Sequence, residues 1–119
     1  MLLQDGTSLA KYTGTWSLVS TSSASNGKLH ASTRAGASVE FKTTARAIAV
    51  VGRKATGNGK AKVYVDGAYV KTIDFYRSST QSKVVVFNTS WNTAALHSVK
   101  LVVVGGTGRV DVDAFVFLR

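Results

Sequence analysis

Aromatic side chains set among polar and basic residues are the features of this sequence best suited to chemistry. The C–H face of a sugar ring packs on Trp or Tyr, while its hydroxyls bond to Asn, Asp, Arg or Lys. Trp91 lies in the polar segment 88–93, where a core residue is out of place. Tyr76 and Arg77 follow the end of a predicted strand. We expect all three side chains to contact a ligand; for Trp91 an alternative stays open, in which the indole closes one end of the fold.

A second aromatic pair comes from two neighbouring predicted strands. Tyr64 alternates with the apolar residues Val63 and Val65, so its side chain is expected on the outer face of its strand. Tyr69 begins the next strand and can form a platform with Tyr64. The two tyrosines are therefore candidate ligand contacts.

The most basic stretch, residues 53–62, holds four cations and no acid around a Gly-Asn-Gly turn. Arg53, Lys54 and Asn58 are its candidate contacts to sulfate, carboxylate or phosphate groups of a polymer. Such contacts weaken with salt and select poorly between anions. The alternative is a solvated hairpin tip. A nucleotide-binding loop is rejected, because Asn58 stands where Lys is required and no helix follows.

Catalysis and metal binding find little support. The only histidines are His30 and His97, and no nucleophile elbow or facing pair of carboxylates is recognisable, so we expect no enzyme. Six acidic residues without the spacing of a calcium loop argue against a metal. No cofactor is therefore expected, and a structural calcium held by Asp5 with Asp111 or Asp113 is the weaker alternative.

These residues must be positioned by β-strands, because short apolar runs alternate with Gly, Ser, Thr and Asn clusters and helical periodicity is nearly absent. Asp66-Gly67 favours a two-residue type I′ turn between two strands, since both positions need positive φ. The predicted strands are 15–20, 28–32, 38–43, 47–52, 61–66, 69–75, 83–88, 97–104 and 109–118. The pattern predicts one all-β, antiparallel sandwich of about eight or nine strands over residues 1–119, with 1–11 as an N-terminal arm.

Two departures from simple alternation carry further expectations. Asp113 would share the core face with Phe115 and Phe117 if the last strand were regular, and a β-bulge near 112–114 would resolve this conflict. Other strands are apolar on both faces, namely 48–51, 84–87 and 101–104. Such strands indicate either a covered outer face, as in a homo-oligomer or a capsid lattice, or merely the β-propensity of Val and Ile.

Composition bounds the partners. The chain has 119 residues, enough for one domain with its own core, and no Cys, so neither disulfides nor thiolate metal sites are possible. A net charge of +9 favours polysaccharide or another anionic surface polymer as partner. No run approaches the roughly 18 apolar residues of a membrane helix, so no membrane partner is expected. The first residues lack the features of a signal peptide, so we expect either an excised domain or a protein that is not exported by the signal-peptide route.

Six motifs in order carry a family resemblance. They are Tyr12-Thr13-Gly14-Thr15-Trp16, Val63-Tyr64-Val65-Asp66-Gly67, Ile73-Asp74-Phe75-Tyr76, Val85-Val86-Phe87, Leu96-His97-Ser98-Val99 and Val110-Asp111-Val112-Asp113-Ala114-Phe115. From Tyr12 to Leu118 the chain resembles the galactose-binding-like jelly-roll domains of bacterial proteins, and it is similar to non-catalytic carbohydrate-binding modules. The resemblance implies a jelly-roll sandwich and an extracellular or cell-surface place within a larger protein. Leu96 departs from the pattern, where such domains often have Gly.

Two functions follow as hypotheses. The first is a non-catalytic module that binds carbohydrate or a cell-surface polymer, with a bias to anionic glycans. The second is a structural protein of a virion, decorating a capsid or associated with a tail, or a surface-assembly protein without sugar affinity. Nucleic acid is not the expected partner, because the outward aromatic residues do not form a recognised stacking platform.

Overall fold

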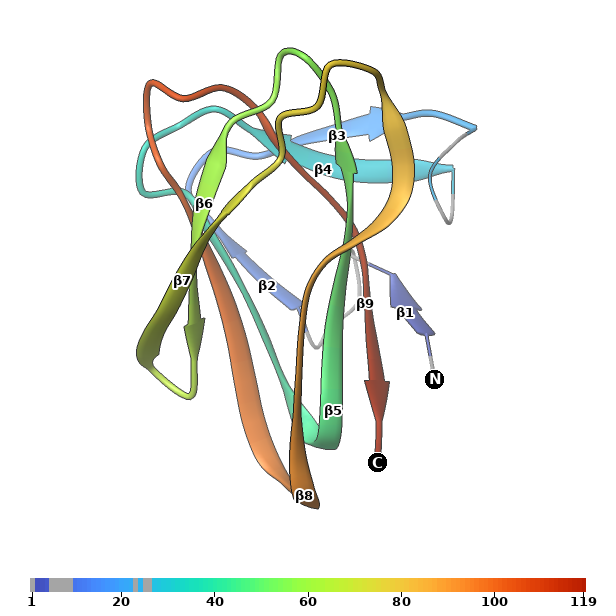
Figure 1. Cartoon of the computed structure of the whole chain (residues 1–119), viewed down its shortest axis with the longest axis vertical. Coiled ribbons are helices and arrows are strands. Elements are labelled where there is room, and N and C mark those ends of the chain that lie inside the picture. Colours follow the sequence, from blue (N-terminus) through green and yellow to red (C-terminus); the bar gives the residue numbers. More distant parts are fainter. Residues whose placement is uncertain (1, 5–9, 23, 25–26) are drawn as a thin grey trace.

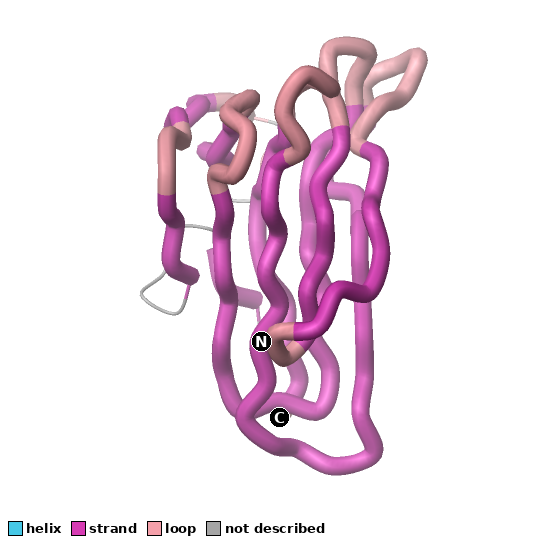
Figure 2. Tube along the Cα trace, turned by 90° about the vertical axis from the view of Figure 1, so that its left-hand side faces the viewer, coloured by secondary structure: helices cyan, strands magenta, loops and turns pink. Residues whose placement is uncertain are grey.

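The computed structural model describes residues 2–4, 10–22, 24 and 27–119. In this part of the chain, nine strands lie in two antiparallel layers and no helix occurs (Figures 1 and 2). The strands are β1 (Leu2–Gln4), β2 (Ala10–Thr13), β3 (Ser17–Ser20), β4 (Lys28–Ser32), β5 (Ser38–Lys54), β6 (Lys60–Val65), β7 (Ala68–Asp74), β8 (Gln81–Val103) and β9 (Val110–Leu118). The prediction of an all-β antiparallel sandwich is confirmed. Among these residues no helix long and apolar enough to cross a membrane is found.

Two long strands belong to both layers. Layer A contains β2, the first half of β5, the second half of β8, β6 and β7. Layer B contains the second half of β5, the first half of β8, β9 and the strands β1, β4 and β3. The change of layer occurs where Ala45 pairs with Ala95 and Ala47 pairs with Ser90. Residues 91–94 of β8 therefore lie opposite Arg46 alone, as an enlarged bulge at the lower end of Figure 1.

The core fills the space between the layers. Phe41 of layer A stacks on Phe115 of layer B, with ring centroids 4.7 Å apart and an angle of 4° between the planes. The other fully buried apolar side chains include Leu29, Val39, Ile48, Val50, Val63, Phe75, Val99, Leu101, Val110 and Val112. Burying each large apolar side chain stabilises the fold by about 1.5–3 kcal/mol. The alternation in the sequence therefore identifies the inward faces correctly.

Local features of the hairpin and the last strand also match expectation. Asp66 and Gly67 have φ values of 51° and 86°, as a type I′ turn requires. In β9, Val112 pairs with Gly52 and Ala114 pairs with Val51, so Asp113 is an extra, bulged residue. The bulge explains how Phe115 points into the core although Asp113 stands two positions before it.

The element boundaries differ from prediction where strands run on. The predicted strands 38–43 and 47–52 are one strand, β5, and 83–88 and 97–104 are one strand, β8. The expected N-terminal arm, 1–11, contributes β1, which pairs with β9, and the start of β2, which pairs with β5. Short edge strands of this kind carry too few alternating residues to be predicted.

Candidate functional site

The connections 33–37, 55–59, 75–80 and 104–109 meet at one end of the sandwich, which we call the loop end (upper end of Figure 1). Backbone hydrogen bonds join these loops to one another and to the strand ends. These hydrogen bonds run from Gly59 N–H to Arg109 O (2.9 Å), from Arg109 N–H to Gly57 O (3.1 Å), from Arg77 N–H to Ala55 O (3.1 Å) and from Gly36 N–H to Val103 O (3.0 Å). The loops of this end are therefore held to one another by backbone hydrogen bonds.

Glycines permit this close approach of the loops. A Cβ on Gly105 would lie 2.4 Å from the Cβ of Ala35, and one on Gly59 would lie 2.4 Å from the carbonyl carbon of Thr107. The Thr107 hydroxyl accepts a hydrogen bond from the Lys60 N–H at 2.9 Å. A surface fixed in this way before a ligand arrives loses less conformational entropy on binding.

A buried carboxylate, Asp111, anchors the loop end from below. Its side chain is fully buried, and Oδ2 accepts hydrogen bonds at 3.1 Å each from Arg53 Nε, Asn58 Nδ2 and Arg109 Nη2. Arg109 Nε lies 2.7 Å from Oδ1, an ion pair whose angle is outside hydrogen-bond geometry. Asn58 also donates to Arg53 O at 2.8 Å. One carboxylate thus ties β5, the 55–59 loop and β9 together.

Burial raises the pKa of Asp111, while the hydrogen bond from Asn58 and the charge of Arg53 oppose that rise. A buried carboxylate needs such compensation, because an unpaired buried charge costs several kcal/mol. Arg53 and Asn58, predicted as ligand contacts, are brought together here, and their polar groups bind Asp111. Their contact with a ligand stays a prediction.

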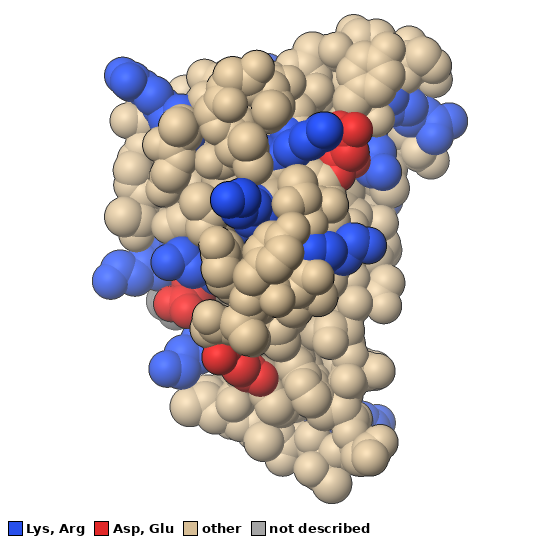
Figure 3. All heavy atoms as spheres, turned by 60° about the vertical axis from the view of Figure 1, so that its left-hand side comes forward, with Lys and Arg blue, Asp and Glu red and all other residues tan. Residues whose placement is uncertain are grey.

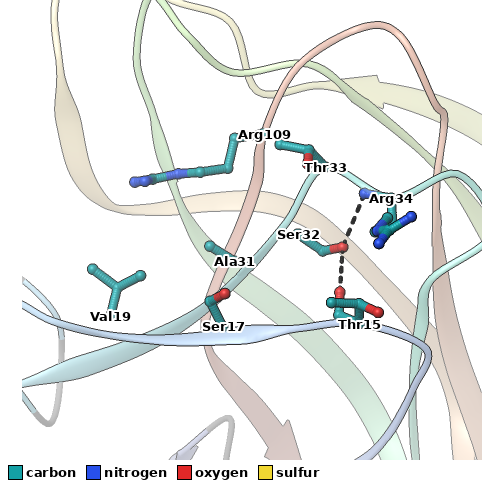
Figure 4. A pocket seen from close by; sticks show the side chains of 8 residues that line it. All are labelled: Thr15, Ser17, Val19, Ala31, Ser32, Thr33, Arg34 and Arg109. Carbon is teal, nitrogen blue, oxygen red and sulfur yellow. Dashed lines mark hydrogen bonds between the residues drawn. The ribbon is translucent and has the colours of Figure 1, made fainter.

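A shallow pocket of about 220 Å³ lies beside this anchor, between β3, β4 and the start of β9. It is lined by Thr15, Ser17, Val19, Ala31, Ser32, Thr33, Arg34 and Arg109 (Figure 4). The buried Ser32 hydroxyl donates to Thr15 O at 2.6 Å and accepts from the Arg34 N–H at 3.2 Å. Figure 4 shows the guanidinium groups on opposite sides of the pocket, that of Arg109 on the side of Val19 and that of Arg34 on the side of Thr15. The pocket thus combines hydroxyls, guanidinium groups and a small apolar floor.

The other basic and aromatic candidates at the loop end are accessible. Tyr76 is 54% exposed, Arg77 is exposed and Lys54 is half-buried. Asp74 caps the Tyr76 N–H at 2.9 Å, which fixes the start of this loop. The space-filling view in Figure 3 shows more basic than acidic groups toward this end.

Tyr64 and Tyr69 lie together on the outer face of layer A, as predicted. They are cross-strand partners, with ring centroids 5.8 Å apart and an angle of 69° between the rings. They belong to the sheet face, so they are separate from the loop end.

Trp91 lies at the opposite end of the sandwich from the loops, in the bulge of β8. Its indole is half-buried against the core and stacks on His97, with centroids 3.6 Å apart and an angle of 2°. His97 Nδ1 pairs with Asp66 Oδ2 at 2.7 Å. Partial burial raises the pKa of Asp66, but hydrogen bonds from the Ser98 N–H and His97 outweigh it and leave the pKa lowered. Trp91 is therefore not brought to the other candidates.

The described residues form no calcium-binding arrangement for the weaker alternative. Asp5 lies outside the described residues, and Asp111 and Asp113 are both buried. Within the described ranges no group of three or more acidic, His or Cys side chains is placed to hold a metal.

The pocket residues were missed by sequence reasoning. Thr15, Ser17 and Ser32 are unremarkable hydroxyl residues, and nothing in their spacing indicates that β3 and β4 meet the start of β9. Arg34 and Arg109 offered the one usable signal, since each stands in a Gly-containing loop between strong strands.

Comparison with known proteins places the fold. No family model matches the chain. It is 32% identical over 106 residues to an A type blood α-D-galactosamine galactosaminidase from Flavonifractor plautii, a match that covers 89% of this chain and 10% of that protein. The chain thus spans about a tenth of the length of this curated relative.

Solved structures share the architecture over the whole chain. A family 35 carbohydrate-binding module from Clostridium thermocellum has a TM-score of 0.71 and 11% identity, and covers 100% of this chain and 98% of its own. A family 35 module from an environmental isolate has a TM-score of 0.70 and 18% identity, with 100% and 93% covered. The expected jelly-roll fold of carbohydrate-binding modules is confirmed.

Proposed function

We propose that this chain is a non-catalytic module that binds carbohydrate at the loop end, in the pocket between β3, β4 and β9. The observation that carries the proposal is that pocket: a preformed recess lined by hydroxyls and two guanidinium groups and held by hydrogen bonds of its own. Preformed recesses with a few convergent polar groups are the usual form of small-ligand sites.

The chemistry of the lining suits a sugar. Val19 and Ala31 offer an apolar floor to the C–H groups of a ring. The hydroxyls of Thr15 and Ser17, on exposed residues, can both donate to and accept from sugar hydroxyls. Arg34 adds a planar donor that matches a carboxylate or a sulfate in two parallel hydrogen bonds.

The bias toward anionic sugars rests on charge. Arg34, Lys54 and Arg77 are accessible cations at this end, and Asp111 is buried beneath Arg53 and Arg109, so its charge is compensated from within. A net charge of +9 over the chain adds a favourable long-range field.

The fold and the relative add support of a coarser kind. The relative is described as a galactosaminidase, and the two structural neighbours are described as carbohydrate-binding modules. Both descriptions concern carbohydrates. At these identities, however, the structures carry the fold alone, so the ligand must be argued from the pocket.

The experiment is a binding screen by isothermal titration calorimetry against neutral and uronate-containing oligosaccharides. The proposal expects at least one sugar to bind, and Arg34→Gln to weaken an acidic sugar about tenfold by loss of a charge-assisted bond. Lys28→Gln removes the same charge from the far end of β4 and serves as the matched control. If no sugar binds the unaltered chain, or if both variants lose affinity equally, the loop-end site is wrong.

The virion or surface-assembly hypothesis stays a prediction. Sedimentation velocity tests it, because a trimer or larger assembly without sugar affinity would favour that alternative.

A further inference from the structure

We infer that the outer face of layer A is a second binding surface, for an extended acidic polysaccharide chain, separate from the loop-end pocket. The features that carry this inference are the pair of the exposed Tyr69 and the half-buried Tyr64, and the lysines near it on the same face. Figure 3 views the molecule from the side of β6 and β7 and shows basic groups spread over it, with fewer acidic groups among them.

The pairing of the strands forms one continuous row of residues across the layer. Lys11 pairs with Glu40, Glu40 with Lys100, Lys100 with Tyr64 and Tyr64 with Tyr69. Each residue that precedes or follows these in β2, β5, β8 and β6 is buried or half-buried, so the row faces outward. With strands about 4.8 Å apart, the row is about 19 Å long, a track for several sugars.

Within the pair, Tyr69 is open to solvent and Tyr64 is half-buried. Tyr69 is 55% exposed, and its hydroxyl is hydrogen-bonded to the Thr72 hydroxyl at 2.8 Å, which fixes the ring. Cross-strand aromatic pairs also stabilise sheets, which is the ordinary explanation for such a pair. That explanation accounts for the contact between the rings but not for the lysines around them.

Cations border the pair on the same face. Lys100 adjoins Tyr64 in the row, and Lys62 stands one row above, opposite Thr72. Lys42, one row below, is more distant, because it lies on β5 and β8 stands between it and the strand of Tyr64. A partner that offers both C–H faces for the rings and anionic groups for the lysines is an acidic glycan.

The geometry of the rings disfavours single-stranded nucleic acid as the partner. Bases need flat aromatic faces on which successive rings stack. Tyr64 and Tyr69 stand at 69° to each other, so they present a notch instead of a continuous flat platform. A glycan, whose rings pack through C–H edges and faces, fits a notch more readily.

The test measures binding of polygalacturonate, heparin, uncharged dextran and single-stranded oligonucleotides at low and high salt. Tyr69→Ala and the double variant Tyr64→Ala, Tyr69→Ala should weaken the acidic glycans about fivefold to tenfold per ring, at both salt concentrations. Lys62→Gln with Lys100→Gln should weaken them at low salt only. The matched controls are Lys28→Gln with Lys83→Gln, for charge, and Leu118→Ala, for exposed surface on layer B.

The loop-end variant Arg34→Gln separates this surface from the proposed pocket: it should weaken short acidic oligosaccharides, and Tyr69→Ala should weaken the polymers by the same further factor with Arg34 present or replaced. Tyr69→Ala alone changes a half-exposed side chain, so it keeps the test valid if the double variant does not fold. The inference is overturned if oligonucleotides bind as tightly as the glycans and depend equally on the tyrosines. It is also overturned if the tyrosine variants bind like the wild type or if the control lysines matter as much as Lys62 and Lys100.

Discussion

Replacing Asp111 by Asn tests whether one carboxylate holds the loop end together. The change keeps the volume of the side chain but removes its charge and turns one oxygen into a donor. Arg53 and Arg109 then lose their counter-ion. The amide oxygen can still accept at the Oδ2 position, but the amide NH2 then faces Arg109 Nε, one donor against another. We expect the variant to fold less stably and to bind sugar less well.

The expected loss follows from burial. Removing one partner of a buried ion pair costs about 3–5 kcal/mol. Asp111 has no exposed surface, but the side chains of Arg53 and Arg109 are 21% and 32% exposed and can recover part of their hydration. The lower value, about 3 kcal/mol, is therefore expected. For 119 residues, the unfolding entropy is about 0.25 kcal/mol/K, so the melting temperature should fall by about 12 °C.

Urea unfolding followed by tryptophan fluorescence, with thermal melts by circular dichroism, measures this loss. Glu40→Gln, a neutralised carboxylate on the outer face of layer A, is the matched control and should change stability by less than about 0.5 kcal/mol. A loss below about 1 kcal/mol for Asp111→Asn, or one no greater than the control, would refute the role assigned to the buried network.

Three other predictions concern separate parts of the fold. The lowered pKa of Asp66 means that its carboxylate stabilises the protein above its ordinary pKa of 3.8, and that this contribution is lost as pH falls through the lower folded pKa. Asp66→Asn should therefore cost more stability at neutral pH than well below pH 3.8, as denaturant melts at both pH values will show; a constant difference contradicts this. Gly105→Ala, against Ala35, should cost about 1–3 kcal/mol by overpacking, whereas Gly57→Ala, with open space around it, should be nearly neutral in the same melts. Phe41→Ala should cost about 3–5 kcal/mol, and a soluble variant of wild-type stability would exclude the stacked core.

Sequence reasoning succeeds where one residue type has one conformational use. Asp66-Gly67 requires positive φ at both positions, and the structure has it. A regular last strand would place Asp113 on the face of Phe115, and a bulge near 112–114 is the expected way to resolve that conflict; Asp113 is the extra residue there and is itself buried. At the Asp-Gly turn local chemistry leaves a single solution, whereas the bulge is shown only by the pairing of β9 with β5.

Sequence reasoning fails where the pairing of distant strands decides the local structure. The polar segment around Trp91 looks like a loop, yet it is a bulge inside β8, because pairing with β5 resumes on both sides. The sequence offers Asp111 only as a weaker calcium candidate and gives no sign that it is the buried partner of two arginines. The pocket joins β3, β4 and Arg109, which the chain separates widely and only the sheet brings together.

Because β5 and β8 run through both layers, the two halves of the molecule share their backbone instead of merely touching through side chains. Separating the layers would break ladder hydrogen bonds in each at the same time. Because the layers share two strands, the protein should unfold as one unit, and the amide protons of layer A and layer B should exchange with solvent at a common, slow rate.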